Sequence, residues 1–143
     1  MSEWLSKPMT DTSTVGIRVP ADLAQLTMLR ALAETVALIA DFALDEVTDI
    51  RVALDEVATS LIVAAAPGSD IECEFDFDDE QMSVRVSAFT AEEDALDQDG
   101  FGWHVLQTIT ETITARRRPF DELAGGYPTV IEFSRLRGEV DDG

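Results

Sequence analysis

The chain has 143 residues, 45 % of them hydrophobic, which is enough for one domain with a hydrophobic core. Ten lysines and arginines stand against 29 aspartates and glutamates, and this formal net charge of −19 disfavours direct binding to DNA or anionic membranes and suits a protein partner. Cys73 is the single cysteine and no stretch reaches the roughly 20 apolar residues of a membrane span, so we expect a cytoplasmic protein without disulfides.

The first half of the chain predicts an arm, a strand and two helices. Residues 1–12 are polar and lack periodicity, which indicates a flexible arm. Apolar residues alternate over 14–19, as is typical of a strand. They then recur at steps of three and four over 21–42 and again over 46–65, which predicts two amphipathic helices.

A β-hairpin is predicted next. Residues 71–78 alternate apolar with acidic side chains, which is typical of a half-buried strand. The run 82–88 alternates in the same way and can pair with it across a turn at 79–80. The segment 89–99 is polar and acidic, and we expect a solvated loop there.

The last third predicts a helix and two strands. The helix follows Gly100 and carries apolar side chains as far as Ile113. Strands are expected over 114–119 and 129–136, joined through a glycine turn at 125–126.

This order of elements predicts the fold class. We expect an α/β (α+β) two-layer sandwich, in which a mixed, mostly antiparallel sheet of about five strands carries three helices on one face. The domain is expected to span 13–137, followed by an acidic tail over 138–143.

Three short motifs are informative through their order and spacing. They are LDEVATS at 54–60 on the second helix, DGFGW at 99–103 before the third, and Gly126 ahead of the strand that begins at Thr129. Together they resemble the anti-sigma factors of the RsbW, SpoIIAB and UsfX type, of the GHKL superfamily. The resemblance covers about 15–136 and implies the Bergerat, or histidine-kinase-like ATPase, fold.

The resemblance implies a catalytic glutamate and a Mg²⁺-binding asparagine four residues apart on the second helix, where one face carries both. Glu56 matches the glutamate, which acts as general base in active kinases of the family. Ser60 stands in place of the asparagine and lacks the amide carbonyl that reaches the ion. Glu56 is therefore a candidate catalytic residue only if the chain is an active kinase, and a solvated helix carboxylate is the alternative. No metal site is expected.

The resemblance also implies a nucleotide site. Its candidate cofactor-binding residues are Ser60, Gly100, Gly102 and Thr129. Glycine amides at a helix start can cradle phosphate, although the same glycines suit an ordinary loop-to-helix junction.

The family's adenine-reading box of one aspartate and two glycines is replaced by Val86, Ala88 and Thr90. A valine offers no acceptor to the adenine amino group. The acidic segment 89–99 is also shorter than the loop that covers the phosphates in ATP-binding relatives. We therefore expect ATP and Mg²⁺ binding to be weak or absent.

Two arginine features are candidates for partner contacts. Arg30, the only basic residue of the first predicted helix, matches a family arginine that contacts sigma and anti-anti-sigma factors. The alternative is an intrachain salt bridge, for instance with Glu34 one turn away. The run Arg116–Arg118 falls on a predicted strand, where it can simply solvate the sheet edge.

The leading hypothesis is an anti-sigma factor that sequesters an alternative sigma factor of the stress or sporulation type and releases it to a STAS-type anti-anti-sigma factor. The alternative is an active serine-protein kinase that phosphorylates the anti-anti-sigma factor with ATP. A scaffold domain that binds neither is a third possibility. Family resemblance and the apolar outer stripe of the first helix suggest a homodimer.

Overall fold

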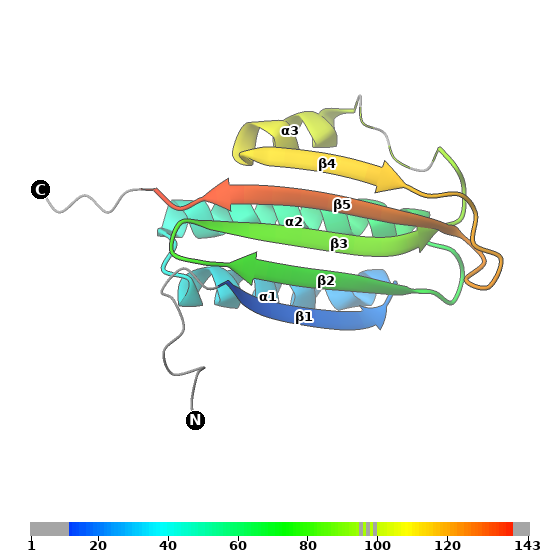
Figure 1. Cartoon of the computed structure of the whole chain (residues 1–143), viewed down its shortest axis with the longest axis horizontal. Coiled ribbons are helices and arrows are strands. Elements are labelled where there is room, and N and C mark those ends of the chain that lie inside the picture. Colours follow the sequence, from blue (N-terminus) through cyan, green and yellow to red (C-terminus); the bar gives the residue numbers. More distant parts are fainter. Residues whose placement is uncertain (1–11, 95, 97, 99, 139–143) are drawn as a thin grey trace, which may run out of the picture.

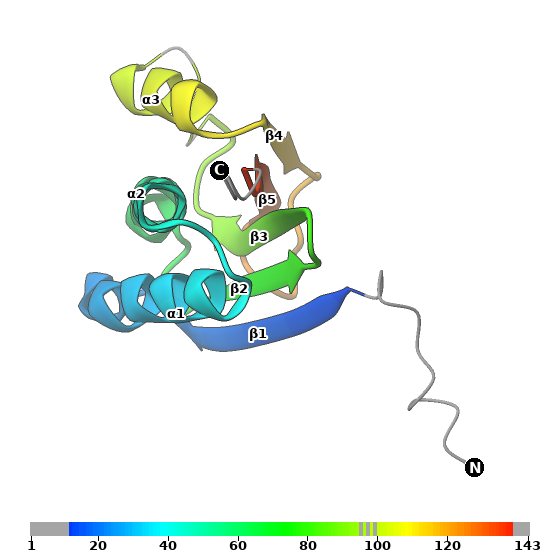
Figure 2. The same ribbon diagram turned by 90° about the vertical axis from the view of Figure 1, so that its left-hand side faces the viewer.

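The protein is a two-layer α+β sandwich, seen in the computed structural model in Figure 1, which describes residues 12–94, 96, 98 and 100–138. One layer is a five-stranded sheet, and three α-helices cover one of its faces, as Figure 2 shows. The predicted class is confirmed. The expectation of a mixed sheet is wrong, because all four strand pairings in the described part of the chain are antiparallel.

The sheet has the strand order β1-β2-β3-β5-β4, so β1 and β4 form its two edges. β2 and β3 form the predicted hairpin, and β5 is inserted between β3 and β4. The strands are β1 (Ser13–Pro20), β2 (Asp70–Phe77), β3 (Gln81–Thr90), β4 (Thr112–Arg117) and β5 (Tyr127–Leu136).

The helices are α1 (Leu26–Ile39), α2 (Leu44–Ala64) and α3 (Phe101–Ile109), with a short 3-10 turn at Leu23–Gln25 ahead of α1. The first helix is shorter than the predicted 21–42, since the chain turns at Asp41, which adopts a positive φ of 63°. α2 begins two residues earlier than predicted, where the Glu46 carboxylate accepts the Ala43 amide at 2.8 Å.

The third helix also ends earlier than predicted. It stops at Ile109 because Thr110 is extended, with φ −121° and ψ 158°, and its hydroxyl caps the Leu106 carbonyl at 2.7 Å. Ile113, predicted to be helical, instead lies on β4 opposite Phe133 of β5. Strand pairing with β5 therefore overrides the helical spacing of this apolar residue.

The core lies between the sheet and α1 and α2, and alternation in the hairpin supplies much of it. Ile71, Phe75, Met82 and Val84 are completely buried, while the residues between them face the opposite side of the sheet. Each such side chain contributes about 1.5–3 kcal/mol by leaving water. Within the described ranges, no helix combines the length and apolar character that crossing a membrane requires.

Candidate functional site: the pocket between α2 and α3

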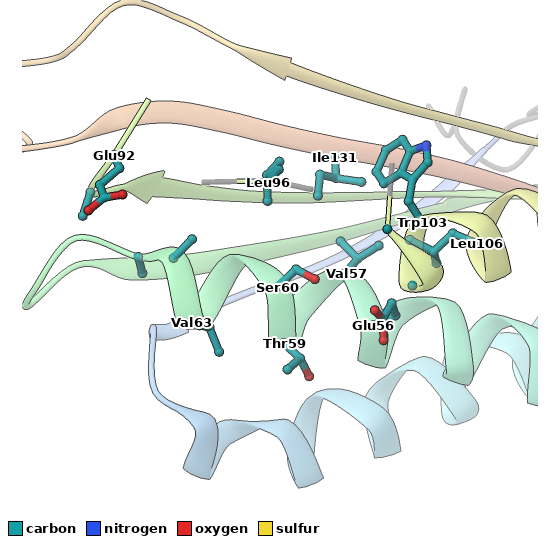
Figure 3. A pocket seen from close by; sticks show the side chains of 15 residues that line it. Glu56, Val57, Thr59, Ser60, Val63, Glu92, Leu96, Trp103, Leu106 and Ile131 are labelled. Carbon is teal, nitrogen blue, oxygen red and sulfur yellow. The ribbon is translucent and has the colours of Figure 1, made fainter. Parts of the chain in front are cut away.

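A pocket with a volume of about 660 Å³ lies between α2 and α3, next to the segment that follows β3 (Figure 3). Its size is that of a small-molecule site. Mostly aliphatic side chains line it, together with Trp103 and a few polar groups. The lining residues are Glu56, Val57, Thr59, Ser60, Val63, Ala64, Ala65, Ala91, Glu92, Leu96, Gly100, Gly102, Trp103, Leu106 and Ile131.

The fold brings together four of the predicted site residues. Glu56 and Ser60 lie one turn apart on α2, and Gly100 and Gly102 come from the start of α3. Figure 3 shows Ser60 directed toward the sheet and Glu56 directed toward α3, whereas Thr59 points to the side of α1. The α2 spacing therefore does place Glu56 and Ser60 at one pocket, as the sequence predicted.

Glu56 and Gly102 are in close contact. A Cβ atom placed on Gly102 would lie 1.9 Å from Glu56 Oε1 and 2.8 Å from the carboxyl carbon. A larger residue at Gly102 would therefore displace the end of the Glu56 side chain from this position. The Glu56 carboxylate consequently lies against the first turn of α3, where a phosphate would approach in the family's glycine box.

Thr129 lies outside the lining of this pocket. Its buried hydroxyl is 3.1 Å from Thr90 Oγ1 and donates to the Tyr127 carbonyl at 3.0 Å. It borders a smaller cavity of about 220 Å³ between β4 and the segment after β3. The structure therefore separates Thr129 from the other three predicted cofactor-binding residues.

The three adenine-box positions of the resemblance are also not among the residues that line this pocket. Val86, Ala88 and Thr90 are buried side chains on the helix-facing side of β3. Val86 pairs with Ile131 across the sheet and belongs to the main hydrophobic core. Two of these three positions thus serve packing, and Thr90 serves the hydroxyl contact with Thr129.

The charge of the pocket is negative. Glu56 and Glu92 are its charged lining residues, and the described lining contains no lysine or arginine. Among the residues that the structure describes, no group of three or more His, Cys, Asp or Glu side chains is placed to hold a metal ion. Trp103 is half-buried against the core, and the neighbouring His104 is exposed.

Arg30 lies on the outside of the helical layer, where α1 meets α2. Its guanidinium Nε is 2.8 Å from Asp55 Oδ1, and about 40 % of the arginine side chain is exposed. Glu34, the expected partner, instead pairs with Arg51 of α2 at 3.4 Å. The alternative of an intrachain ion pair is therefore present, with Asp55 as the partner of Arg30 in place of Glu34, because two antiparallel helices form a ladder with one ion pair on each turn.

Sequence reasoning missed Asp55 as the partner of Arg30. A signal was available: the pairs Arg30–Glu34 and Arg51–Asp55 have the same spacing of four and the same charge order, with the arginine first. When the two helices pack side by side and run antiparallel, the arginine of each pair lies opposite the carboxylate of the other. The register between the two helices could not be read from either helix alone.

The outer face of α1 carries a largely uncharged surface. Met28, Leu38 and Ile39 are exposed there, together with Leu23 of the preceding turn. The charged residues of α1 are Arg30 and Glu34, and α2 engages both of them. An apolar stripe of this kind on a chain of net charge −19 is typical of a surface that another protein covers.

Comparison with known proteins finds relatives of this chain. The chain is 32 % identical over 99 residues to the "Anti-sigma-F factor RsbW" of Mycobacterium tuberculosis, in strains CDC 1551 and H37Rv. The match covers 69 % of this chain and 59 % of the relatives, so it spans less than two thirds of their length. No protein-family model matches the chain.

A structural relative comes from "The crystal structure of SiaB-SiaC complex from Pseudomonas aeruginosa". One of its chains superposes with a TM-score of 0.63 at 9 % identity, covering 85 % of this chain and 89 % of that one. At this identity the likeness supports the fold alone. In its sequence match, its two-layer fold and the order of its site elements, the chain is similar to the RsbW-type anti-sigma factors.

Proposed function

We propose that the chain is an anti-sigma factor that acts in the cytoplasm by binding and sequestering an alternative sigma factor of the stress or sporulation type. A STAS-type anti-anti-sigma factor would compete for it and release the sigma factor. The similarity to a protein named for anti-sigma-F activity is the observation that carries this proposal. A stoichiometric inhibitor needs a complementary surface of about 800 Å² on each partner, and it does not need a nucleotide site.

The pocket between α2 and α3 does not fit Mg²⁺ and ATP well. Ser60 offers the ion a hydroxyl instead of an amide carbonyl, and Val86 is a core residue that offers adenine no acceptor. A triphosphate would also meet Glu56 and Glu92 without a compensating basic residue in the described lining. These features support a binder with weak or absent nucleotide binding.

The surface around Arg30 is the proposed contact with the sigma factor. Arginine forks hold carboxylates in two parallel hydrogen bonds, and Asp55 keeps this guanidinium in place at 2.8 Å. Because the side chain remains partly exposed, a partner carboxylate can share it from the solvent side. Asp55 then acts as a positioning residue for Arg30.

The apolar outer face of α1 supports a homodimer. Met28, Leu38 and Ile39 expose aliphatic surface on a helix whose two charged residues are already engaged. A second copy that covered this face would remove that surface from water. Sedimentation equilibrium of the protein and of Leu38→Glu tests this, and a wild type that stays monomeric at high concentration would contradict it.

The kinase alternative places different demands on the same pocket. Phosphoryl transfer depends on fixed positions for metal and triphosphate, so Glu56 alone cannot support it. Calorimetric titration with Mg²⁺-ATP distinguishes the two functions. Micromolar binding of Mg²⁺-ATP would favour a kinase, and the absence of measurable binding heat would favour the sequestering anti-sigma factor.

The proposed function is tested by co-expression of the chain with each alternative sigma factor of its host. One stable complex should form, and Arg30→Ala should weaken it while leaving the thermal unfolding midpoint of the free chain nearly unchanged. Arg51→Ala is the matched control, since it removes a neighbouring paired arginine on α2. Failure to form a complex with any sigma factor would favour the scaffold alternative.

A further inference from the structure

We propose that the edge strand β4 and the hairpin between β4 and β5 form a docking surface for an extended acidic segment of a partner protein. This surface is independent of Arg30 and of the pocket, and it lies at the opposite edge of the sheet from β1. The proposal goes beyond the anti-sigma function. It rests on charge, on exposed apolar side chains and on a free strand edge.

The basic charge is concentrated at the end of β4. Arg116, Arg117 and Arg118 are consecutive in a chain that has only ten basic residues. The Arg116 side chain is 71 % exposed, and a Glu132 carboxylate oxygen lies 3.9 Å from its terminal nitrogen. Such a concentration of positive charge on an acidic protein creates a local field that attracts carboxylates.

Arg117 links this charge to an aromatic cluster. Its guanidinium carbon lies 5.4 Å from the centre of the Tyr127 ring, within the range of a cation–π contact, and Glu93 lies 3.3 Å from its terminal nitrogen. Phe120 packs edge-on against Tyr127, with ring centres 5.3 Å apart. Arginine, tyrosine and other aromatic residues are enriched among the residues that dominate protein interfaces.

The hairpin tip displays apolar side chains on a well-held loop. Leu123 is fully exposed and Phe120 is about half exposed. The Asp121 carboxylate accepts the amides of Leu123 and Ala124 at 2.9 and 3.2 Å, and the Asp121 backbone pairs with Gly126. A loop held by these bonds loses little conformational freedom when a partner covers its apolar tip.

β4 also offers backbone groups. Among the described strands, β5 is its neighbour on one side and no strand pairs with its other side. The sequence alone allows a simpler interpretation, in which the arginines do no more than solvate this edge strand. Solvation of the edge does not account for the exposed side chains of Leu123 and Phe120 at the end of the same edge. If a partner adds a strand to β4, its contact uses the backbone groups, the arginines and the apolar tip together.

The chemistry of the surface favours a polypeptide over a nucleic acid. The net charge of −19 disfavours a phosphate backbone, because a nucleic acid carries closely spaced negative charges along its whole length and only part of it could lie on the arginines. A short acidic peptide brings far less charge with it. An extended segment with alternating carboxylate and apolar side chains suits both the arginines and the leucine tip.

The test uses the full chain and a fluorescein-labelled peptide of alternating glutamate and valine, followed by fluorescence anisotropy at low and at physiological salt. We expect saturable binding that weakens as salt rises. Arg116→Ala combined with Arg118→Ala should weaken it about tenfold or more, as expected for the loss of two charge-assisted contacts. Leu123→Ala should weaken it at both salt concentrations.

The matched control combines Arg18→Ala with Arg51→Ala, which removes the same charge from β1 and α2 and should leave peptide affinity within about twofold. Amide shift changes in an NMR titration should fall on β4 and the hairpin. The proposal is overturned if the peptide does not bind, if both double variants weaken it equally, or if the shifts lie elsewhere. Binding of an oligothymidine in place of the peptide would also overturn it.

Discussion

The contact between Glu56 and Gly102 allows a sharp test of the pocket geometry through Gly102→Ala. In a helix, alanine is more stable than glycine by about 0.5–1 kcal/mol, so the substitution should stabilise α3 if nothing else changes. Here the new Cβ would lie 1.9 Å from Glu56 Oε1, far inside van der Waals contact. The end of the glutamate side chain must therefore move out of its position.

These two effects oppose each other, and a double-mutant cycle separates them. In the wild-type background we expect Gly102→Ala to change the free energy of unfolding by less than about 0.5 kcal/mol. In a Glu56→Ala background the clash is absent, so the same change should stabilise by about 0.5–1 kcal/mol. The coupling is therefore expected to be about 0.5–1 kcal/mol.

The assay is urea unfolding of the four proteins, followed by circular dichroism and by tryptophan fluorescence, since Trp103 follows Gly102 on α3. Glu92→Ala is the matched control background, because it removes the other carboxylate of the pocket lining. Equal stabilisation by Gly102→Ala in the wild-type and Glu56→Ala backgrounds would refute the contact and with it the derived position of Glu56.

Three further predictions concern other parts of the molecule. Glu46→Ala should lower the free energy of unfolding by about 1–2 kcal/mol in urea unfolding, because the buried carboxylate accepts the amides of Ala43 and Gly138; an unchanged stability would contradict this role. Arg30→Ala should lower the affinity for the sigma factor about tenfold by calorimetry with an unaltered unfolding midpoint, and unaltered affinity would remove Arg30 from the site. Burial raises the pKa of the Cys73 thiol from 9.0 to about 12, so this thiol loses its proton at a lower pH in the unfolded chain than in the folded chain. The free energy of unfolding, measured relative to that of Cys73→Ala, should be constant below pH 9 and then fall by about 1.4 kcal/mol per pH unit up to pH 12. If the unfolding free energies of the two proteins change in parallel with pH, the thiol is not buried as described.

Most of the fold could be predicted because its elements have strong periodic patterns. The hairpin of β2 and β3 shows strict alternation, and the buried faces of both strands came out as expected. Errors arose where one residue type fits two structures. Ile113 continued the spacing of α3, and only pairing with Phe133 from another part of the chain decides that it is on a strand.

The site could be predicted in part, for a related reason. Glu56 and Ser60 lie on one helix, so their shared direction follows from helical spacing alone. Thr129 and the Arg30 partner depend on how distant segments pack, which the sequence of one segment does not determine. Asp55 faces Arg30 because α1 and α2 run antiparallel.

The central claim is that this chain, which is similar to the RsbW-type anti-sigma factors, works as a binding protein whose partner contact does not depend on nucleotide. The most direct measurement is the affinity of the full chain for its sigma factor by calorimetry, in the presence and absence of Mg²⁺-ATP. Our account predicts a stable complex with the same affinity in both conditions. Absence of a complex, or an affinity that rises severalfold when Mg²⁺-ATP is added, would contradict it.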